Sequence, residues 1–463
     1  MGIPALVDLA AGNPDWIVFV TSGLLTVFVG MVLRGASRGR PGKLSLRGAF
    51  VMTVLIWIAL AVFGALPIYW AGLDNIHIAD AVFESISGLT TTGATVIVGL
   101  DDLPPGILLW RSLLQWLGGL GIVVMAIAVL PMLQVGGMQL FKAEAFDTPE
   151  KILPRAAQIS SQMTLIYIAL TMLCAAAYKV TGMTGFDAVN HAMTTVATGG
   201  FSTHDASIGY FDSTPVELVC VAFMISGSLP FLLYLKVLRT GDGPALYRDE
   251  QVRGFFGILL FFAFTVWVYE VVALDEAGVI PAREALFNVT SIMTGTGYAT
   301  ADYNGWGAFS AWLFFALTFC GGCAGSTSCG IKVFRFQVIV ANIGRHLALT
   351  LSPNQVVVRR FNGRRIQDDV YAAVMNFFFL YLVVFATVAV VLSALGLDAM
   401  TALSASATAI SNVGPGLGEI IGPAGNFASL PDSAKWVLGL TMLIGRLELL
   451  TVLVLFVPQF WRG

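Results

Sequence analysis

Nine apolar stretches, separated by polar segments, follow one another along the chain. A helix needs about 20 apolar residues to cross a membrane, and the pattern predicts spans at 16–33, 49–72, 106–133, 153–180, 213–238, 254–275, 305–335, 370–396 and 432–457. Four shorter, more polar segments lie between pairs of spans, at 77–92, 184–199, 281–296 and 398–413. Each is predicted to be a re-entrant half-helix, because irregular backbone at membrane depth must be buried in protein or line a watery cavity.

A glycine-bearing turn ends each of these four segments. The turns are Thr91-Thr92-Gly93, Thr198-Gly199-Gly200, Gly295-Thr296-Gly297 and Asn412-Val413-Gly414, and their last glycines are 107, 97 and 117 residues apart. This spacing indicates an internal repeat. We therefore predict an all-α integral membrane protein with four pseudo-repeated helix–pore loop–helix units around a central pore, plus one extra N-terminal helix. The expected bounds are 1–48 for the N-terminal helix and basic loop, then 49–133, 153–238, 254–335 and 370–457 for the units.

Composition agrees with a membrane protein. The chain of 463 residues is 57% hydrophobic and 11% charged, whereas soluble domains carry about 25% charged residues. Its five cysteines all lie in apolar stretches, so no disulfide framework is expected. The first 15 residues have no basic region and do not resemble a signal peptide.

Charge differs between alternate loops. The loops 34–48, 134–155, 236–253 and 336–369 are rich in Lys and Arg and are predicted to be cytoplasmic. The opposite loops are acidic, so the four turns should open to the outside. An acidic mouth would concentrate cations, although topology alone also makes outer loops poor in bases.

The turns have the chemistry of a site for a monovalent cation. Rings of main-chain carbonyls can replace the water shell of an ion, and glycine allows the backbone angles that aim them. The negative end of each half-helix dipole favours a cation there. No carboxylate lies within the turns, whereas Ca²⁺ and Mg²⁺ prefer carboxylates. The expected ligands are Thr92, Gly93, Gly199, Gly200, Thr296, Gly297, Val413 and Gly414, while the alternative is that the glycines serve close helix packing.

The seventh span contains the glycine-rich segment 321–330. Its glycines (Gly321, Gly322, Gly325 and Gly330) each disfavour a helix by about 1 kcal/mol, so we predict a loop within the membrane. Cys320-x₂-Cys323 does not resemble a zinc site, because no His is near and Cys329 is badly spaced. The segment also departs from a phosphate-binding loop by one residue before Lys332.

Two bases accompany this segment. Arg446 lies inside the last span, where a charge normally faces a cavity or a partner, and pairing with Glu448 on another helix face is not expected. Lys332 follows the loop, and the alternative for it is a base that snorkels to the interface. Glu84 is predicted to support the first turn from behind, and His191 and His204 are expected to be structural or exposed.

Four segments carry a resemblance to a known family. FESISGLTTTGATV (83–96), HAMTTVATGGFSTHD (191–205), NVTSIMTGTGYATADY (288–303) and SATAISNVGPGLGEI (406–420) resemble the filter segments of the Trk/Ktr/HKT potassium transporter superfamily, with the TrkH type most similar. The resemblance implies potassium as the transported ion, four pore units, a homodimer with one pore per protomer, and a multi-pass protein of the bacterial inner membrane. It also implies a cytoplasmic regulatory partner of the TrkA type that binds ATP, ADP or NAD(H). No cofactor is expected in this chain, and no nucleic-acid partner.

The resemblance also assigns roles to individual residues. It places the segment with Gly321, Gly322, Gly325 and Gly330 below the third filter segment as a gating loop, with Lys332 and Arg446 near the gate. Gly93 stands where serine accompanies sodium permeability in the family, which favours potassium. One departure concerns the N-terminus, where one helix rather than two precedes the first unit, and residues 1–8 resemble the tail of the missing helix.

Three functions compete at this point. The first is potassium uptake through a gated pore, and the second is an inverted-repeat symporter of a cation or small solute, which also has broken helices. Symporters of that kind usually have two discontinuous helices rather than four and carry carboxylates within their spans, whereas Glu217, Glu270 and Glu448 are the few candidates here. The third, a membrane-embedded enzyme, lacks a HExxH motif or an aspartate pair within the spans, so the chain is not expected to be an enzyme.

Overall fold

Helices form almost the whole protein. A computed structural model of the chain describes residues 1–37, 45–128, 152–273, 279–358 and 360–462. The described strands are β1 (Arg360–Phe361) and β2 (Arg364–Arg365), which pair as a short antiparallel hairpin. The all-α membrane fold predicted from the sequence is thus confirmed. All five cysteines lie within the described ranges and carry free thiols.

A long helix, a half-helix and a further helix follow one another four times after an N-terminal pair. The pair is α1 (Gly2–Ala11) and α2 (Trp16–Ala36). Then come α3 (Leu46–Trp70), α4 (Ile78–Leu89), η1 (Leu100–Asp102) and α5 (Pro105–Ala128); α8 (Ile152–Val180), α9 (Gly185–Val196), η3 (Ser207–Phe211), α10 (Thr214–Ser228), α11 (Phe231–Thr240) and α12 (Ala245–Arg248); α13 (Glu250–Ala273), α14 (Val279–Thr294), η4 (Tyr303–Trp306), α15 (Ala308–Thr318) and α16 (Val333–Leu351); and α17 (Asp368–Ala394), α18 (Ala399–Ser411), α19 (Asp432–Arg446), α20 (Leu449–Leu453), η5 (Val454–Phe456) and α21 (Pro458–Arg462).

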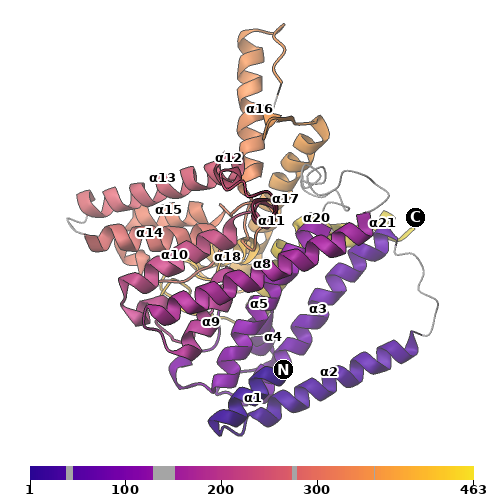
Figure 1. The fold of residues 1–463 in the computed structure, drawn as a ribbon, viewed down its shortest axis with the longest axis vertical. Coiled ribbons are helices and arrows are strands. Elements are labelled where there is room, and N and C mark those ends of the chain that lie inside the picture. The colour runs from indigo at the N-terminus through magenta and orange to yellow at the C-terminus, as the bar shows by residue number, and fades with distance from the viewer. Residues whose placement is uncertain (38–44, 129–151, 274–278, 359, 463) are drawn as a thin grey trace.

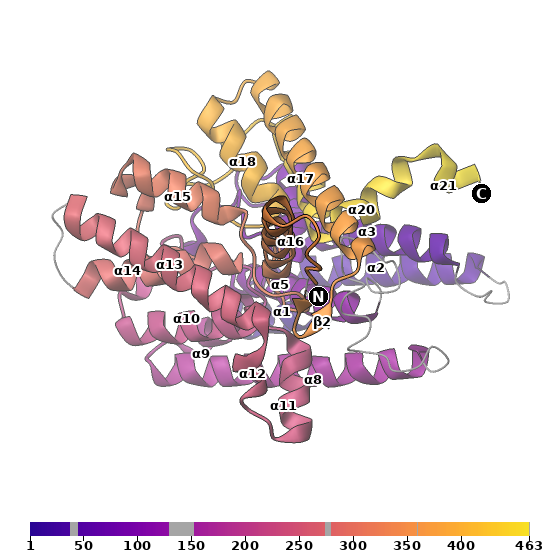
Figure 2. The same cartoon turned by 90° about the horizontal axis from the view of Figure 1, so that it is seen from above.

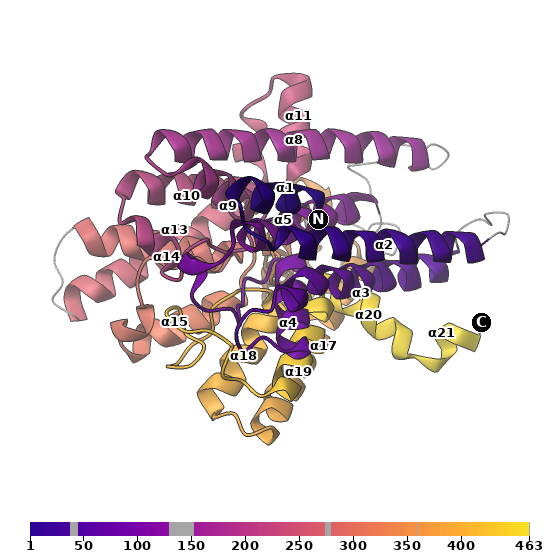
Figure 3. The same ribbon diagram turned by 90° about the horizontal axis from the view of Figure 1, so that it is seen from below.

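The four units surround one central region. Seen from above, the groups α2–α5, α8–α11, α13–α15 and α17–α19 lie on successive sides of it (Figure 2), and the view from below shows the same order (Figure 3). The short helices α4, α9, α14 and α18 are the predicted half-helices, and most of the described residues in them are buried. The polar groups of a buried helix must find hydrogen-bond partners within the protein. Accordingly, Ser85 donates to the Ala61 carbonyl (2.7 Å) and Ser406 donates to the Phe385 carbonyl (2.8 Å).

A glycine in the second long helix lets it approach the half-helix in three units. A Cβ atom added to Gly118, Gly227 or Gly445 would lie closer than 3.0 Å to a carbonyl oxygen of the half-helix end. Those carbonyls belong to Leu89, Val196 and Ile410, which hold equivalent positions in the three units. Small residues are the usual means by which membrane helices come this close.

Two predicted spans are not continuous helices. The span predicted at 213–238 is divided into α10 and α11, which meet at 89°, and the span at 432–457 is divided into α19 and α20–η5, which meet at 112°. Pro230 explains the first break, because proline cannot donate a helix bond and keeps the preceding residue, Leu229, extended. At the second break Glu448 adopts a φ of 60°, outside the helical region.

The seventh span is interrupted as predicted. α15 ends at Thr318 and α16 begins at Val333, with a loop of irregular backbone between them. α16 then runs to Leu351, beyond the predicted end of the span at 335, and projects from the body of the protein (Figure 1). Among the described residues, six helices are long and apolar enough to span a membrane, or up to eight if each bent pair counts as one span.

Candidate functional site

The four half-helices end in the same hydrogen-bonded turn. At each end a main-chain N–H donates to the carbonyl five residues earlier at 2.9 Å, from Thr92 to Ser87, Gly199 to Thr194, Thr296 to Ser291 and Val413 to Thr408. The residue before each donor is left-handed, with φ of 52° at Thr91, Thr198 and Asn412 and 77° at Gly295. This is the Schellman arrangement that closes helix C-termini. The sequence repeat therefore corresponds to a repeat of backbone geometry.

A second left-handed residue follows two positions later in three of the turns. Gly93, Gly200 and Gly297 have φ of 87°, 81° and 82°. Gly414, the last glycine of the fourth turn, differs from these three and is not among the residues with positive φ. Gly414 is instead required by close approach, because an added Cβ would lie 3.0 Å from the Gly93 carbonyl carbon and oxygen.

The four turns contact one another in a closed ring. A Cβ on Gly93 would clash with the Gly199 carbonyl oxygen, and a Cβ on Gly200 would clash with the Thr296 carbonyl oxygen. A Cβ on Gly297 would lie 2.9 Å from the Gly414 nitrogen, and Gly414 in turn faces Gly93. The first turn thus meets the second, the second the third, the third the fourth, and the fourth the first. Residues more than 300 positions apart in the chain meet around one axis.

A small cavity lies on one side of this ring. It has a volume of about 80 Å³, and its lining includes all four last glycines together with Arg111, His204 and Asp205. His204 bonds to Asp101 at the edge of this region, and this hydrogen bond holds the pKa of the Asp101 carboxyl below its ordinary value. His191 is buried and bonds through both ring nitrogens, to the Asp187 carbonyl and the Ser202 hydroxyl, which is the structural role predicted for it.

The chemistry of the ring is that of main-chain carbonyls and hydroxyls. Thr92 Oγ1 bonds to Thr90 Oγ1, and Thr296 Oγ1 bonds to Thr294 Oγ1, both at 2.7 Å. Within the described ranges no group of three or more His, Cys, Asp or Glu side chains is placed to hold a metal ion. The atoms at the ring that could bind a cation are therefore uncharged oxygens at the C-terminal ends of the half-helices, where the helix dipole is negative.

The interrupted segment between α15 and α16 folds into a tight loop on the other side of the ring. Its two ends pair, with Gly321 N donating to the Ile331 carbonyl (2.9 Å) and Ile331 N donating to the Phe319 carbonyl (3.1 Å). Gly325 and Gly330 have φ of 74° and 71°, and a Cβ on Gly321 would clash with the Cys329 carbonyl. These glycines are thus needed for the loop as well as for breaking the helix.

The tip of this loop touches the ring directly. Thr327 Oγ1 lies 3.3 Å from Thr198 Oγ1, and Cys329 Sγ lies 3.5 Å from Thr91 Oγ1. A Cβ on Gly295 would lie 3.3 Å from Cys329 N. The loop tip therefore sits immediately beside three of the four turns.

Arg446 binds the loop tip. Its guanidinium donates to the Thr327 carbonyl (3.1 Å), to the Gly118 carbonyl of α5 (3.2 Å) and to Cys329 Sγ. The side chain is 4% exposed. As expected from the sequence, Glu448 does not pair with Arg446, and it pairs instead with Arg335 of α16.

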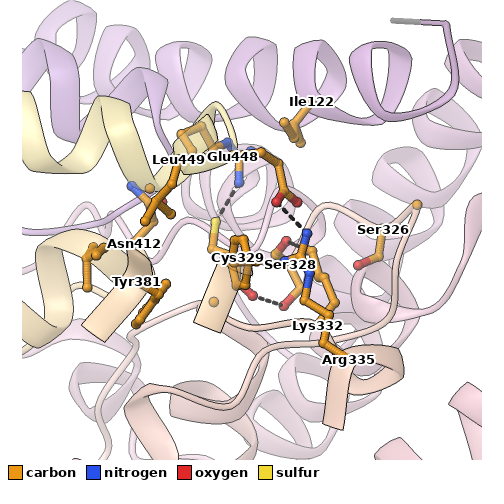
Figure 4. A pocket seen from close by; sticks show the side chains of 16 residues that line it. Ile122, Ser326, Ser328, Cys329, Lys332, Arg335, Tyr381, Asn412, Glu448 and Leu449 are labelled. Carbon is orange, nitrogen blue, oxygen red and sulfur yellow. Dashed lines mark hydrogen bonds and ion pairs between the residues drawn. The ribbon is translucent and has the colours of Figure 1, made fainter. Parts of the chain in front are cut away.

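A second, smaller cavity lies below the loop. Its volume is about 30 Å³, and its lining includes Cys329, Lys332, Arg335, Arg446 and Glu448. Figure 4 shows Cys329, Lys332 and Glu448 around this space. A cavity needs about 10–15 Å³ to hold one water molecule, so this space admits only a few. Lys332 donates to the Ser328 carbonyl within the loop and is half-buried.

Sequence reasoning missed two buried side chains of α5. Arg111 is 1% exposed and pairs with Glu84 (2.8 Å), and Gln115 is fully buried against the second turn. A charge within the span LLWRSLLQWL is itself a signal for function in a membrane helix. The predicted support by Glu84 is confirmed as a contact, because its carboxylate accepts from Val96 N (2.9 Å) and Thr95 Oγ1 (3.0 Å) just after the first turn.

Comparison with known proteins places this geometry in a family. The model of the TrkH family, described as "Cation transport protein", matches residues 17–462. The Trk system potassium uptake protein TrkI of Halomonas elongata is 46% identical over 465 residues, covering 100% of this chain and 94% of that protein. TrkH of Escherichia coli K12 is 39% identical and covers 100% of this chain and 96% of its own length. The crystal structure of the potassium transporter TrkH from Vibrio parahaemolyticus superposes with a TM-score of 0.92 at 38% identity, covering 99% of this chain and 95% of that one. The chain therefore belongs to the TrkH family of cation transport proteins, and it is a membrane transporter rather than an enzyme.

Proposed function

We propose that the protein takes up K⁺ across the cytoplasmic membrane through one pore in each chain, and that the ring of four turns is its selectivity filter. The observation that carries this proposal is the closed ring, in which four Schellman turns meet around one axis. The relatives at 46% and 39% identity are named potassium uptake proteins, which supports K⁺ as the ion. The four units, with predicted bounds 49–133, 153–238, 254–335 and 370–457, would each supply one wall of the pore.

The ion would be held by oxygens of the turns. Carbonyls and hydroxyls of Thr92, Gly93, Gly199, Gly200, Thr296, Gly297, Val413 and Gly414 are the proposed ligands. Uncharged oxygens suit a large monovalent ion better than a divalent one, which prefers carboxylates. The half-helix dipoles add a favourable field without a fixed charge that would trap the ion.

The loop 319–332 would be the gate. Its tip lies beside Thr91, Thr198 and Gly295, where it would block the axis, and the cavity below it is too small for a hydrated ion. Arg446 would hold the loop in place, and its positive charge would repel cations at the position of the loop tip. Opening then requires the loop to leave the ring and the bond between Arg446 and Thr327 to break.

The side of the protein that carries α16 would face the cytoplasm. The basic loops predicted to be cytoplasmic include 336–369, which contains most of α16 and the hairpin β1–β2. α16 projects from the body and exposes apolar residues such as Val340, Ile343 and Leu347. We propose this extension as a contact for a TrkA-like nucleotide-binding subunit, which would bind ATP, ADP or NAD(H), and we propose a homodimer as the assembled state. The filter mouth would face outside.

Growth and flux test the proposal together. Expression in a bacterial strain that lacks its own potassium uptake systems should restore growth at low K⁺, and the purified protein in vesicles should admit Rb⁺. A symporter of organic solutes would give neither result. Failure of both, with the protein shown to be in the membrane, would refute the proposed function.

A further inference from the structure

Two side chains of α5, which lie one helical turn apart, form hydrogen bonds with the second turn and the residues that follow it. Gln115 Nε2 donates to the Gly199 carbonyl (2.5 Å), and Phe201 N donates to Gln115 Oε1 (3.0 Å). One turn of helix away, Arg111 donates to the Ser202 carbonyl (3.0 Å), and its guanidinium lies 4.1 Å from the centre of the Phe201 ring. Three residues of the second turn and the segment after it, Gly199, Phe201 and Ser202, are therefore bound by two side chains of another unit.

The same arginine also ties the first turn to the second. Its Nε donates to Glu84 (2.8 Å), whose carboxylate holds Thr95 and Val96 after the first turn. Arg111 itself donates to Thr95 Oγ1 (3.2 Å). Arg111 and Glu84 are at most 1% exposed, and a buried charge is tolerated only when it is paired and hydrogen-bonded. The planar fork of arginine can serve several acceptors in fixed directions at once, which lysine cannot.

Three of the four units can be aligned by their geometry, and only the first of these three has an arginine and a glutamine at these positions. Gly118, Gly227 and Gly445 all pack on the end of a half-helix and so mark one position in three units. Three residues before them stand Gln115, Met224 and Met442, and seven residues before them stand Arg111, Cys220 and Leu438. Methionine at the equivalent position shows that a side chain of similar size fits there without an amide. The amide of Gln115 is therefore not required simply to fill space.

We propose that Arg111 and Gln115 form a clamp that sets the distance between the first and second turns, and that this clamp determines how strongly the pore prefers K⁺ to Na⁺. The proposal rests on the proposed function. A filter distinguishes two ions by the positions and field of its oxygens. Gly199 carries one of the proposed ligand carbonyls, and its oxygen lies against Gly93 of the first turn. A side chain that fixes this oxygen restrains the ring where two units meet, and Arg111 and Gln115 act as positioning residues rather than ligands.

The test is the permeability ratio of K⁺ to Na⁺, measured from reversal potentials of the full-length protein in planar bilayers. Gln115→Met introduces the residue found at the equivalent position of two other units and removes both bonds to the second turn. Loss of one buried hydrogen bond changes an equilibrium by about fivefold, so the ratio should fall by about fivefold or more. Arg111→Lys keeps the charge and should also lower the ratio. Gln337→Met, which removes the bond from Gln337 Nε2 of α16 to the Glu250 carbonyl of α13 (2.6 Å), is the matched control and should leave the ratio unchanged.

Each result decides the proposal. Ratios equal to wild type in both clamp variants would overturn it, as would failure of both variants to insert, because that result would assign the two residues to folding. A general loss of current with an unchanged ratio would also count against it, since a merely structural role predicts that result. A wild-type protein without preference for K⁺ would overturn the proposed function and the clamp with it, whereas a selective wild type with unaffected variants would overturn the clamp alone.

Discussion

Removing Arg446 should open the pathway. Arg446→Ala deletes the bonds to the Thr327 carbonyl (3.1 Å) and the Gly118 carbonyl (3.2 Å), which together join the loop tip to α5. It also removes a buried positive charge from the cavity below the ring. The loop itself should keep its shape, because Thr327 Oγ1 still donates to the Gly227 carbonyl (2.9 Å) and Gly321 still pairs with Ile331.

The size of the effect follows from these contacts. A hydrogen bond to a charged group contributes about 1.5–3 kcal/mol, and the bond to Thr327 is the one that must break for the loop to leave. Its loss should shift the balance between the closed and open loop by about 10- to 100-fold. Two unit charges 4 Å apart interact by about 4 kcal/mol at an effective dielectric constant of 20, so removing the charge lowers the barrier to a cation further. Basal flux should therefore rise at least about tenfold.

Rb⁺ uptake into vesicles that contain the purified protein alone measures this flux. Arg446→Lys is the matched control, because it keeps the charge but cannot reach Thr327 and Gly118 together, and its flux should lie between wild type and Arg446→Ala. An Arg446→Ala protein that folds, inserts and conducts no more than wild type would refute both proposed roles of Arg446, which are to hold the loop in place and to repel cations.

Three further changes test other parts of the site. Gly93→Ser places a side chain against the Gly199 carbonyl at a φ of 87° and should lower the K⁺/Na⁺ permeability ratio; unchanged reversal potentials would contradict the filter assignment. Gly118→Ala forces a methyl group into the Leu89 carbonyl and should cost about 1–3 kcal/mol of stability, seen as a lower melting temperature in detergent, whereas Gly121→Ala, with its nearest contact at 3.6 Å, should be tolerated. Glu448→Gln removes the carboxylate that pairs with Arg335 between α16 and α20 and should cost about 3–5 kcal/mol; a melting temperature equal to that of wild type would show that the pair does not stabilise the fold.

The repeat of spans and half-helices could be predicted because it depends on local properties. Apolar length fixes a span, and the four half-helices begin and end within three residues of their predicted bounds. The broken seventh span was also predictable, since four glycines in ten residues disfavour a helix wherever they occur. These features need no knowledge of which segments meet in space.

The bends of the fifth and ninth spans were not predicted, for different reasons. Pro230 could have indicated the first, because it follows Leu229 directly and proline ends helices locally. At the second bend, Glu448 pairs with Arg335, 113 positions earlier in the chain. A residue that leaves the helical region to meet a distant partner gives no local signal.

The clamp illustrates the same limit within the site. Arg111 could be noticed as a charge in a span, but its contacts with Ser202 and Thr95 follow from the way the first two units pack together. The left-handed angle of Gly93 could be expected from glycine alone, whereas the need for glycine at position 414 arises from its approach to the first turn. Contacts between units are therefore the part of the site that sequence patterns do not contain.

The most direct measurement is the reversal potential of the purified protein in a planar bilayer with K⁺ on one side and Na⁺ on the other. If carbonyls of the four turns replace the hydration shell of K⁺, the reversal potential should lie near the equilibrium potential of K⁺ and should move with the K⁺ gradient when that gradient is changed. A reversal potential near zero that does not respond to the K⁺ gradient would contradict the account.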